Sequence, residues 1–246
     1  MEDAANERII IAKLSVTLHE LKRVMNVDSK SSPNMCIINS GGLRELRIEQ
    51  GQHLTIGDLH TLMPFSDTVQ RIKLKGSDIL AAMERSVENL CEDDTQGKFL
   101  QMSGLKVKFD LSKPNFHRVV ELLVSDIDES APATDESYKL VFKPLDLNRT
   151  YLLVTNSYLI DGGNGYWMIK KNLLGQDRSE ISDVDVLTWY LRKHGKFRGR
   201  TDGRITFVND EKKICQNSSS RPHLHQMSNP FMMTLAVVVS LMISIK

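Results

Sequence analysis

The sequence predicts an α/β fold, a single domain with one mixed β-sheet flanked by helices, followed by a hydrophobic C-terminal tail. Two observations predict this fold. Short apolar or alternating runs, typical of strands, are mixed with segments of helical periodicity, without the regular alternation of a doubly wound fold. The chain of 246 residues is also 41% hydrophobic, which is enough for a sizeable core.

The first elements are expected as follows. Apolar residues between Ile11 and Met25 step by three and four, which predicts an amphipathic helix. The apolar run 35–38 predicts a buried strand that ends in a glycine-containing loop. Next we expect a short helix at 56–63 stopped by Pro64, a strand at 69–75, and a helix that Ser77 caps and that carries apolar residues as far as Leu90.

The second half predicts mostly strands. Strict alternation at 105–109 is typical of a half-buried strand. Further strands are expected at 119–124, 138–142, 151–154 and 204–208, with a helix at 182–193 and an acidic solvated loop at 126–136. The domain is expected to span 9–208, after a polar stub at 1–8 and before a polar spacer at 209–229 and the tail at 230–246.

Charge and cysteine content exclude several classes of site. A net charge of +1 provides no long-range field for nucleic acid, and the basic run 192–200 is interpreted as a solvated helix end. No nucleic-acid partner is expected. The three cysteines have no paired spacing, and Cys36, inside an apolar run, is expected to be a small buried hydrophobic residue.

Catalytic motifs are missing from the sequence. The histidines are scattered without metal-ligand spacing, and the nearest pair, His223 and His225, lies in the polar spacer. No Walker lysine follows the glycine clusters, and no nucleophile elbow occurs. We therefore expect no catalytic residue, no metal and no cofactor to be bound by this chain.

Three loops could instead bind a small molecule. Asn39 and Arg44 flank two glycines, Phe65 follows a proline, and Tyr158 precedes a glycine-rich turn that ends at Tyr166. Taken singly, each loop has a simpler interpretation, such as a glycine turn with a surface arginine or an aromatic core residue.

Taken in order, six markers resemble the C-terminal domain of the 5′-nucleotidase family, over residues 9–208. The family includes ecto-5′-nucleotidases, apyrase-like enzymes and bacterial UDP-sugar hydrolases. The markers are Asn39-Ser40-Gly41-Gly42-Leu43-Arg44, Leu62-Met63-Pro64-Phe65, Ile72-Lys73-Leu74-Lys75-Gly76, Phe99-Leu100-Gln101-Met102-Ser103-Gly104-Leu105, Asp161-Gly162-Gly163-Asn164-Gly165-Tyr166 and Gly203-Arg204-Ile205-Thr206-Phe207.

The resemblance implies a role for five residues. Phe65 and Tyr158 would sandwich the base, with Asn39 and Arg44 binding polar groups nearby. The family usually has phenylalanine at Tyr158, and aspartate at Asn164 to accept hydrogen bonds from the ribose hydroxyls. An amide offers those hydroxyls one uncharged acceptor oxygen, so Asn164 is expected to bind ribose less well.

The C-terminal end predicts membrane attachment. Small residues Asn217, Ser218 and Ser219, a polar spacer and the apolar tail form the signature of a GPI-attachment signal, with a tail anchor as the alternative. Asn148 and Asn217 are candidate glycosylation sites. The polar N-terminal stub is unlike an export signal, so the cell-surface location expected for a GPI-anchored protein requires a longer precursor.

Three hypotheses follow. In the family, a dimetal site on a separate N-terminal domain hydrolyses nucleoside 5′-monophosphates to nucleoside and phosphate. The chain is therefore expected to be a truncated 5′-nucleotidase that recognises nucleotides without hydrolysing them. The alternatives are a membrane-anchored module that captures nucleosides, or forms a homodimer or a dimer with a full-length nucleotidase, and a decayed paralogue.

Overall fold

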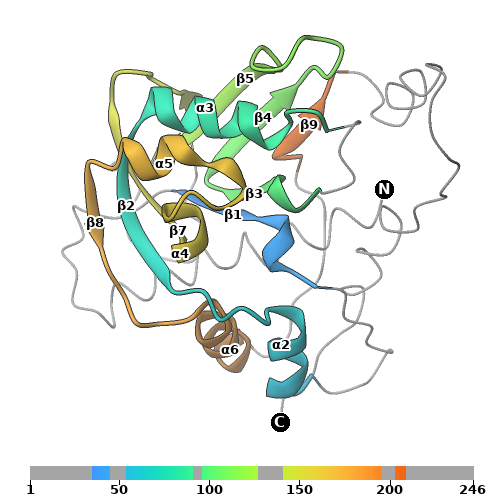
Figure 1. The fold of residues 1–246 in the computed structure, drawn as a ribbon, viewed down its shortest axis with the longest axis vertical. Coiled ribbons are helices and arrows are strands. Elements are labelled where there is room, and N and C mark those ends of the chain that lie inside the picture. The colour runs from blue at the N-terminus through green and yellow to red at the C-terminus, as the bar shows by residue number, and fades with distance from the viewer. Residues whose placement is uncertain (1–34, 45–53, 91–95, 127–140, 195–202, 209–246) are drawn as a thin grey trace, which may run out of the picture.

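The computed structural model describes residues 35–44, 54–90, 96–126, 141–194 and 203–208 (Figure 1). The helix expected near the N-terminus, the spacer, the apolar tail and most of the basic run lie outside these residues. So do Cys91, Cys215 and the candidate attachment residues Asn217, Ser218 and Ser219.

The strands form two mixed sheets rather than the single sheet that we expected. The five-stranded sheet has the order β3-β1-β7-β2-β8 and the four-stranded sheet the order β6-β5-β4-β9. The strands are β1 (Met35–Asn39), β2 (Val69–Lys75), β3 (Leu100–Ser103), β4 (Leu105–Phe109), β5 (Val119–Asp126), β6 (Val141–Pro144), β7 (Thr150–Asn156), β8 (Gly175–Asp177) and β9 (Ile205–Phe207).

Gly104 marks the point where the chain passes from one sheet to the other. It separates β3 from β4 and adopts a φ of 69°, which glycine tolerates without steric cost. In each sheet one neighbouring pair is parallel, β1 with β7 and β4 with β9, and the other pairs are antiparallel. Each sheet is therefore mixed, as expected, but there are two sheets instead of one.

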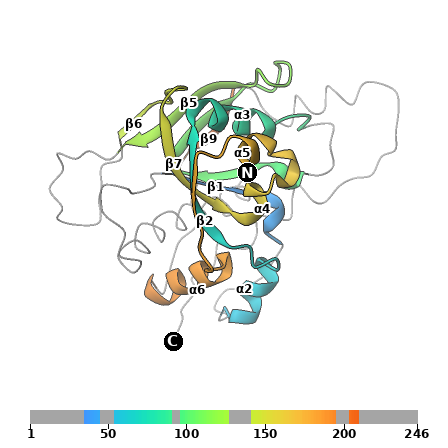
Figure 2. The same ribbon diagram turned by 60° about the vertical axis from the view of Figure 1, so that its left-hand side comes forward.

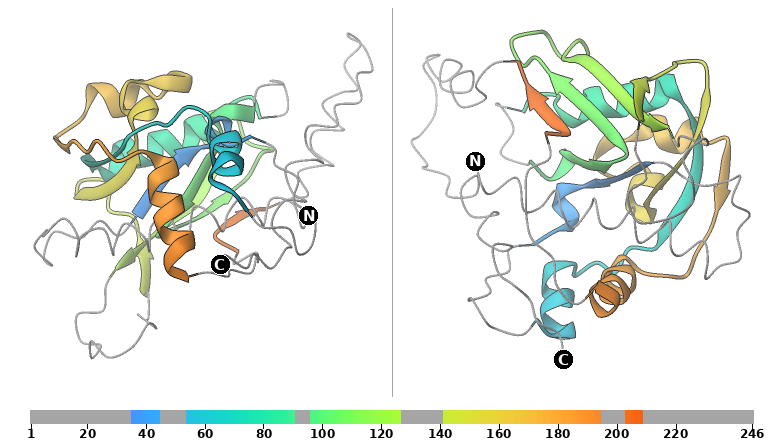
Figure 3. Two further views of the ribbon diagram at one scale, coloured as in Figure 1. Left: turned by 90° about the horizontal axis from the view of Figure 1, so that it is seen from below. Right: turned by 180° about the vertical axis from the view of Figure 1, so that it is seen from behind.

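Helices cover both faces of the five-stranded sheet. They are α2 (Ile56–Leu62), α3 (Gly76–Ser86), α4 (Ser157–Ile160), α5 (Trp167–Lys171) and α6 (Asp183–His194), with short 3-10 turns η2 (Ser40–Gly42), η3 (Gln96–Lys98) and η4 (Gly163–Gly165). Figures 1 and 2 show α2 and α6 together on one side of this sheet, and α3 and α5 on the other side. Figure 3 shows the strands of the second sheet, β4, β5, β6 and β9, from behind.

Strand β1 lies between two apolar cores. Met35 and Ile37 belong to the core beneath α3 and α5, whereas Cys36 and Ile38 belong to the core beneath α2 and α6. Because successive side chains of a strand point to opposite faces, a strand buried on both faces must be apolar throughout. Burial raises the pKa of the Cys36 thiol to about 12, so this cysteine is the inert buried residue that we expected.

The helix boundaries follow local capping and, in one case, tertiary contact. Thr55 and Asp58 form a reciprocal capping box at α2, with hydrogen bonds of 3.1 and 2.7 Å, and the helix ends before Pro64 as expected. The expected cap at Ser77 is wrong, because α3 already begins at Gly76. A Cβ atom at Gly76 would lie 2.1 Å from the carbonyl oxygen of Asp146, so the close approach of the turn before β7 requires glycine at this position.

Most of the remaining elements were predicted, and four short ones were not. Strands β2, β4, β5, β7 and β9 and helix α6 lie where the sequence pattern placed them, within one or two residues at their ends. Strand β6 begins at Val141, and the preceding residues of the expected strand 138–142 lie outside the described part. Strands β3 and β8 and helices α4 and α5, each of five residues or fewer, were not predicted.

The start of α6 contains a buried carboxyl group. Ser182 and Asp185 cap the helix reciprocally: the Asp185 amide donates to Ser182 Oγ at 3.1 Å, and Ser182 Oγ donates to the Asp185 carboxylate at 2.7 Å. Between them, Asp183 is buried and accepts the Val184 N–H at 2.8 Å. Burial, reinforced by the neighbouring Asp67 carboxylate, raises the pKa of Asp183 to about 7.

The raised pKa of Asp183 predicts a pH-dependent stability. An aspartate in the unfolded chain titrates near ~3.9, so between about pH 4 and 7 the folded chain holds the extra proton. The free energy of unfolding therefore falls as the pH rises through this window. Because Asp183→Asn needs no proton, we expect it to be more stable than wild type at pH 8, and this gain to shrink towards pH 4.

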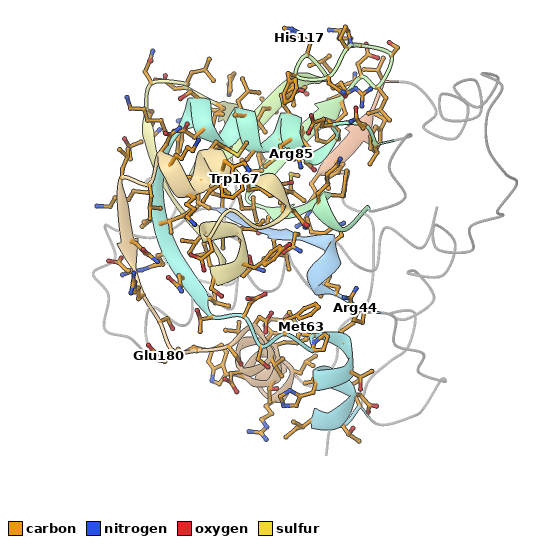
Figure 4. All side chains as sticks on the ribbon, in the orientation of Figure 1. Arg44, Met63, Arg85, His117, Trp167 and Glu180 are labelled. Carbon is orange, nitrogen blue, oxygen red and sulfur yellow. The ribbon has the colours of Figure 1, made fainter. Side chains whose placement is uncertain are left out.

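Urea unfolding at several pH values measures this effect. Glu180→Gln is the control, because Glu180 is an exposed carboxylate at the periphery of the molecule (Figure 4). A gain for Asp183→Asn that stayed constant from pH 4 to 8 would show that Asp183 does not titrate differently in the folded state.

Candidate functional site

The candidate site lies at one edge of the five-stranded sheet. Strands β1 and β7 are parallel, with Met35 opposite Leu153 and Cys36 opposite Val154, so their carboxyl ends reach the same edge. Strand β2 begins at this edge, because Val69 pairs with Asn156 at the end of β7. Ligands of α/β proteins commonly bind outside the carboxyl ends of such strands. The segments that follow β1 and β7 and precede β2 carry the candidate residues Asn39, Arg44, Phe65, Tyr158 and Asn164.

Asn39 ends β1 and is only 4% exposed. Its Oδ1 accepts a hydrogen bond of 3.2 Å from Nδ2 of Asn156, the last residue of β7. Asn156 Oδ1 in turn accepts the Leu159 N–H at 3.2 Å and so caps α4. Asn39 therefore joins the ends of the two parallel strands and, through Asn156, fixes the helix that carries Tyr158.

Arg44 and Phe65 form a contact between the loop after β1 and the loop after α2. The guanidinium carbon of Arg44 lies 5.0 Å from the centre of the Phe65 ring, within the range of a cation–π interaction. The Arg44 N–H also donates to the Leu62 carbonyl at 2.8 Å, which holds the two loops together. Phe65 is 56% exposed, whereas Met63, beside Arg44 in Figure 4, is buried and fills the core.

Tyr158 packs its ring on the glycine-rich turn. A Cβ atom on Gly163 would lie 2.4 Å from the Tyr158 ring, so only glycine allows this approach. The Tyr158 hydroxyl donates to Asn164 Oδ1 at 3.0 Å and accepts the Asn164 N–H at 3.2 Å. The ring is nevertheless 40% exposed, so it offers surface to a ligand.

Asn164 connects the turn to two further segments. Its Nδ2 donates to the Gly97 carbonyl at 2.9 Å, and its own carbonyl accepts two hydrogen bonds from Arg85, at 3.1 and 2.9 Å. Gly97 itself packs against Gly41, in the loop after β1. The turn is thus fixed to α3, to η3 and, through Gly97, to the loop that contains Asn39 and Arg44.

Arg85, Gly97 and Asn156 were missed by the sequence analysis. Asn156 had a usable signal, since an asparagine that precedes a helical segment at a strand end is a typical N-cap. Arg85 and Gly97 had none, because their roles depend on contacts with a residue more than sixty positions away. Tyr166, at the end of the turn, is fully buried and donates to the Lys98 carbonyl, and burial raises its pKa.

The remaining predictions concern glycosylation, metal binding and membrane attachment. Asn148 is exposed in the turn before β7, and its glycosylation stays a prediction. Among the described residues, no cluster of His, Cys, Asp and Glu side chains could hold a metal ion, so this part of the chain does not fit a dimetal centre. His223 and His225 lie outside it. No helix within the described ranges is long and apolar enough to cross a membrane.

Comparison with known proteins gives consistent matches. The family model described as 5′-nucleotidase, C-terminal domain, matches residues 14–171, which include all five candidate site residues. The 5′-nucleotidase of Rattus norvegicus is 34% identical over 175 residues, which cover 71% of this chain and 28% of the relative. That of Diplobatis ommata is 30% identical over 224 residues, 90% of this chain and 36% of the relative.

The solved structures agree with the sequence matches. The crystal structure of a 5′-nucleotidase precursor from Thermus thermophilus superposes with a TM-score of 0.66 and 30% identity, over 81% of this chain and 35% of that one. The chain thus spans about a third of the length of these relatives. It belongs to the 5′-nucleotidase family and carries the family's C-terminal domain.

Proposed function

We propose that this chain is a nucleotide-recognition domain that binds the base of a nucleoside or nucleotide between Phe65 and Tyr158. Membership of the 5′-nucleotidase family supports the proposal. The observation that carries it is the presence of two exposed aromatic rings on neighbouring segments at one edge of the sheet.

Hydrogen bonds join the two segments beside the rings. Ser157, next to Tyr158, donates from Oγ to the Asp67 carboxylate at 3.0 Å, and its Oγ accepts the Thr68 N–H at 3.2 Å. The Ser157 N–H donates to the Thr68 carbonyl at 2.9 Å. Asp67 lies two residues after Phe65, so the backbones that carry the two rings are held side by side before any ligand binds.

Pre-positioned rings favour binding without a strict choice of base. Stacking of a base on an aromatic side chain contributes ~1–3 kcal/mol and tolerates different bases, because every base has a π-face. Little entropy is lost on binding when the loops are already ordered. A site of this kind therefore suits purine and pyrimidine nucleosides alike.

Arg44 would supply the local positive charge of the site. Its guanidinium rests on the exposed Phe65 ring, and the side chain is exposed, so its remaining N–H groups can donate to polar groups of a bound base or to a phosphate. Because the chain has a net charge of only +1, recognition of an anionic ligand would depend on such local contacts.

The reaction and location of the whole protein are proposals that go beyond the described residues. We propose that the domain contributes base recognition to the conversion of nucleoside 5′-monophosphate to nucleoside and phosphate. The metal ligands for that reaction would have to come from outside the described residues. Attachment to the cell surface through a GPI anchor, glycosylation at Asn148 or Asn217, and dimerisation stay predictions.

Replacing Phe65 tests the stacking proposal. We expect Phe65→Ala to weaken adenosine binding roughly 5- to 100-fold, because one stacking face worth ~1–3 kcal/mol is lost. Phe65→Tyr should keep the affinity within a few-fold. Isothermal titration calorimetry of the folded chain with adenosine measures both variants.

Phe116→Ala is the matched control. Phe116 is 58% exposed but lies in the loop between β4 and β5, beside His117, which Figure 4 shows far from Arg44. Its replacement should leave adenosine binding unchanged. Equal losses for Phe65→Ala and Phe116→Ala would rule out a specific stacking site at Phe65.

The chain is also expected to bind nucleotides without hydrolysing them. The sequence has no His and Asp cluster with metal-ligand spacing, so we expect no release of phosphate from AMP when zinc or cobalt is added. Phosphate release well above a control without protein would contradict this prediction.

A further inference from the structure

The loop between β4 and β5, residues 110–118, exposes an aromatic ring at its tip. Phe116 is 58% exposed, and Lys113 and His117 near it are exposed as well. Figure 4 shows His117 far from Arg44, so the loop lies away from the candidate site. A single exposed ring needs no explanation by itself. Two further observations distinguish this one.

The first observation is the backbone conformation of Phe116. Its φ of 67° lies in the left-handed region, where a bulky side chain is an outlier because its Cβ crowds the following carbonyl oxygen. Such conformations persist only where the surrounding structure enforces them, and they gather at functional positions. The loop therefore holds the ring at its tip against a backbone cost.

Hydrogen bonds to α3 and to the segment after it enforce this conformation. The Asn89 N–H donates to Asn115 Oδ1 at 3.1 Å, and Asn115 Nδ2 donates back to Asn89 Oδ1. On the other side of the tip, the Arg118 N–H donates to the carboxylate of the buried Glu84 at 2.9 Å. Because the loop is fixed on both sides of Phe116, the ring loses little entropy when it binds a partner.

The second observation is the place where the chain leaves the described domain. Val208, the last described residue, lies at the base of this loop, because its N–H donates to the carbonyl of Phe109, the residue before the loop, at 2.8 Å. Val208 is 45% exposed, and Val120, just after the loop, is 38% exposed. Two further exposed apolar side chains thus lie at the same end of the sheet as Phe116.

The sequence after Val208 connects this end of the domain to the apolar tail. Residues 209–229 are a polar spacer, and residues 230–246 are the tail for which we predict membrane attachment. A tether that starts beside the loop raises the effective concentration of lipid around this face of the domain. Weak contacts of the loop are then sufficient, whereas a protein without a second anchor would need stronger ones.

The chemistry of the loop suits the interface of a phospholipid membrane. Aromatic and apolar side chains enter the boundary between headgroups and acyl chains, and basic side chains bind the lipid phosphates. The loop offers Phe116 for the first contact and Lys113 for the second. Its only acidic residue, Asp110, lies at the base, where its Oδ1 accepts the Ser112 N–H at 3.1 Å. The tip is therefore apolar and weakly basic.

We propose that the loop 110–118 is a membrane contact, in which Phe116 enters the headgroup region of the lipid layer that holds the tail and Lys113 binds lipid phosphate. The inference rests on the proposed membrane attachment and is independent of base recognition. It gives the domain an orientation, with the ends of β4, β5 and β9 towards the lipid. Arg44, far from His117 in Figure 4, then stays open to the solution.

Quenching by brominated lipids tests the contact, with the full chain bound to vesicles of phosphatidylcholine and phosphatidylserine. Phe116→Trp keeps an aromatic ring at the tip and adds a fluorophore, and the wild-type chain gives the background from Trp167 and Trp189. With bromine atoms near the headgroup end of the acyl chains, we expect the added emission to fall roughly two- to fivefold, because an interfacial side chain lies at this depth. Adding Lys113→Ala should weaken the quenching.

Ile56→Trp is the matched control. Ile56 is 49% exposed and begins α2, which lies at the end of the molecule opposite to His117 in Figures 1 and 4. The emission that this variant adds should be almost unchanged by the brominated lipids.

The outcomes separate this inference from membrane attachment. If the chain does not float with the vesicles, attachment is wrong and the inference fails with it. If the chain floats but Phe116→Trp is quenched no more than Ile56→Trp, attachment stands and the loop contact is overturned. If the wild type then also dimerises in detergent and Phe116→Ala does not, the ring is a contact between copies of this chain instead.

Discussion

The parallel pairing of β1 with β7 is the interaction on which the rest of the structure depends. Both strands are buried in the middle of the five-stranded sheet, and both end in asparagine, Asn39 and Asn156. Leaving a buried polar side chain without a partner costs ~1–3 kcal/mol, and the Asn39–Asn156 hydrogen bond avoids this cost at the point where the loops diverge. The same bond therefore sets the strand ends and positions α4.

Elements with a strong local pattern could be predicted from the sequence, and their arrangement could not. The apolar run of β1 reflects burial on both faces of that strand, and the alternation of β4 reflects burial on one face only. The number of sheets depends on which strands pair across long separations, and Gly104 between β3 and β4 has no local signature of a change of sheet. Likewise, the first residue of α3, Gly76, has to be glycine because a Cβ atom there would clash with Asp146, seventy residues later.

The candidate site shows the same division between local and long-range information. Phe65 lies in a loop and Tyr158 in the short helix α4, next to proline and glycine residues that marked both segments as turns, and the structure exposes both rings. The residues that hold these segments in place could not be predicted from the sequence. Arg85 contacts Asn164 from 79 positions away in the chain, and Gly97 contacts it from 67 positions away. Resemblance to the family predicted which surface would face a ligand, and only the structure identified the residues that support that surface.

Tyr158 and Asn164, the two positions at which the resemblance led us to expect a departure from the family pattern, are coupled to each other. Tyr158 brings a hydroxyl that must donate its proton, and the Gly97 carbonyl needs a donor in the same place. An asparagine side chain meets both needs with one oxygen and one amide nitrogen, whereas a carboxylate would accept from Tyr158 and repel the Gly97 carbonyl. Because Asn164 also suits the left-handed backbone of the turn, a single residue satisfies the backbone and both neighbouring segments. Changes at residues 158 and 164 should therefore be strongly non-additive, since each side chain supplies the other's partner.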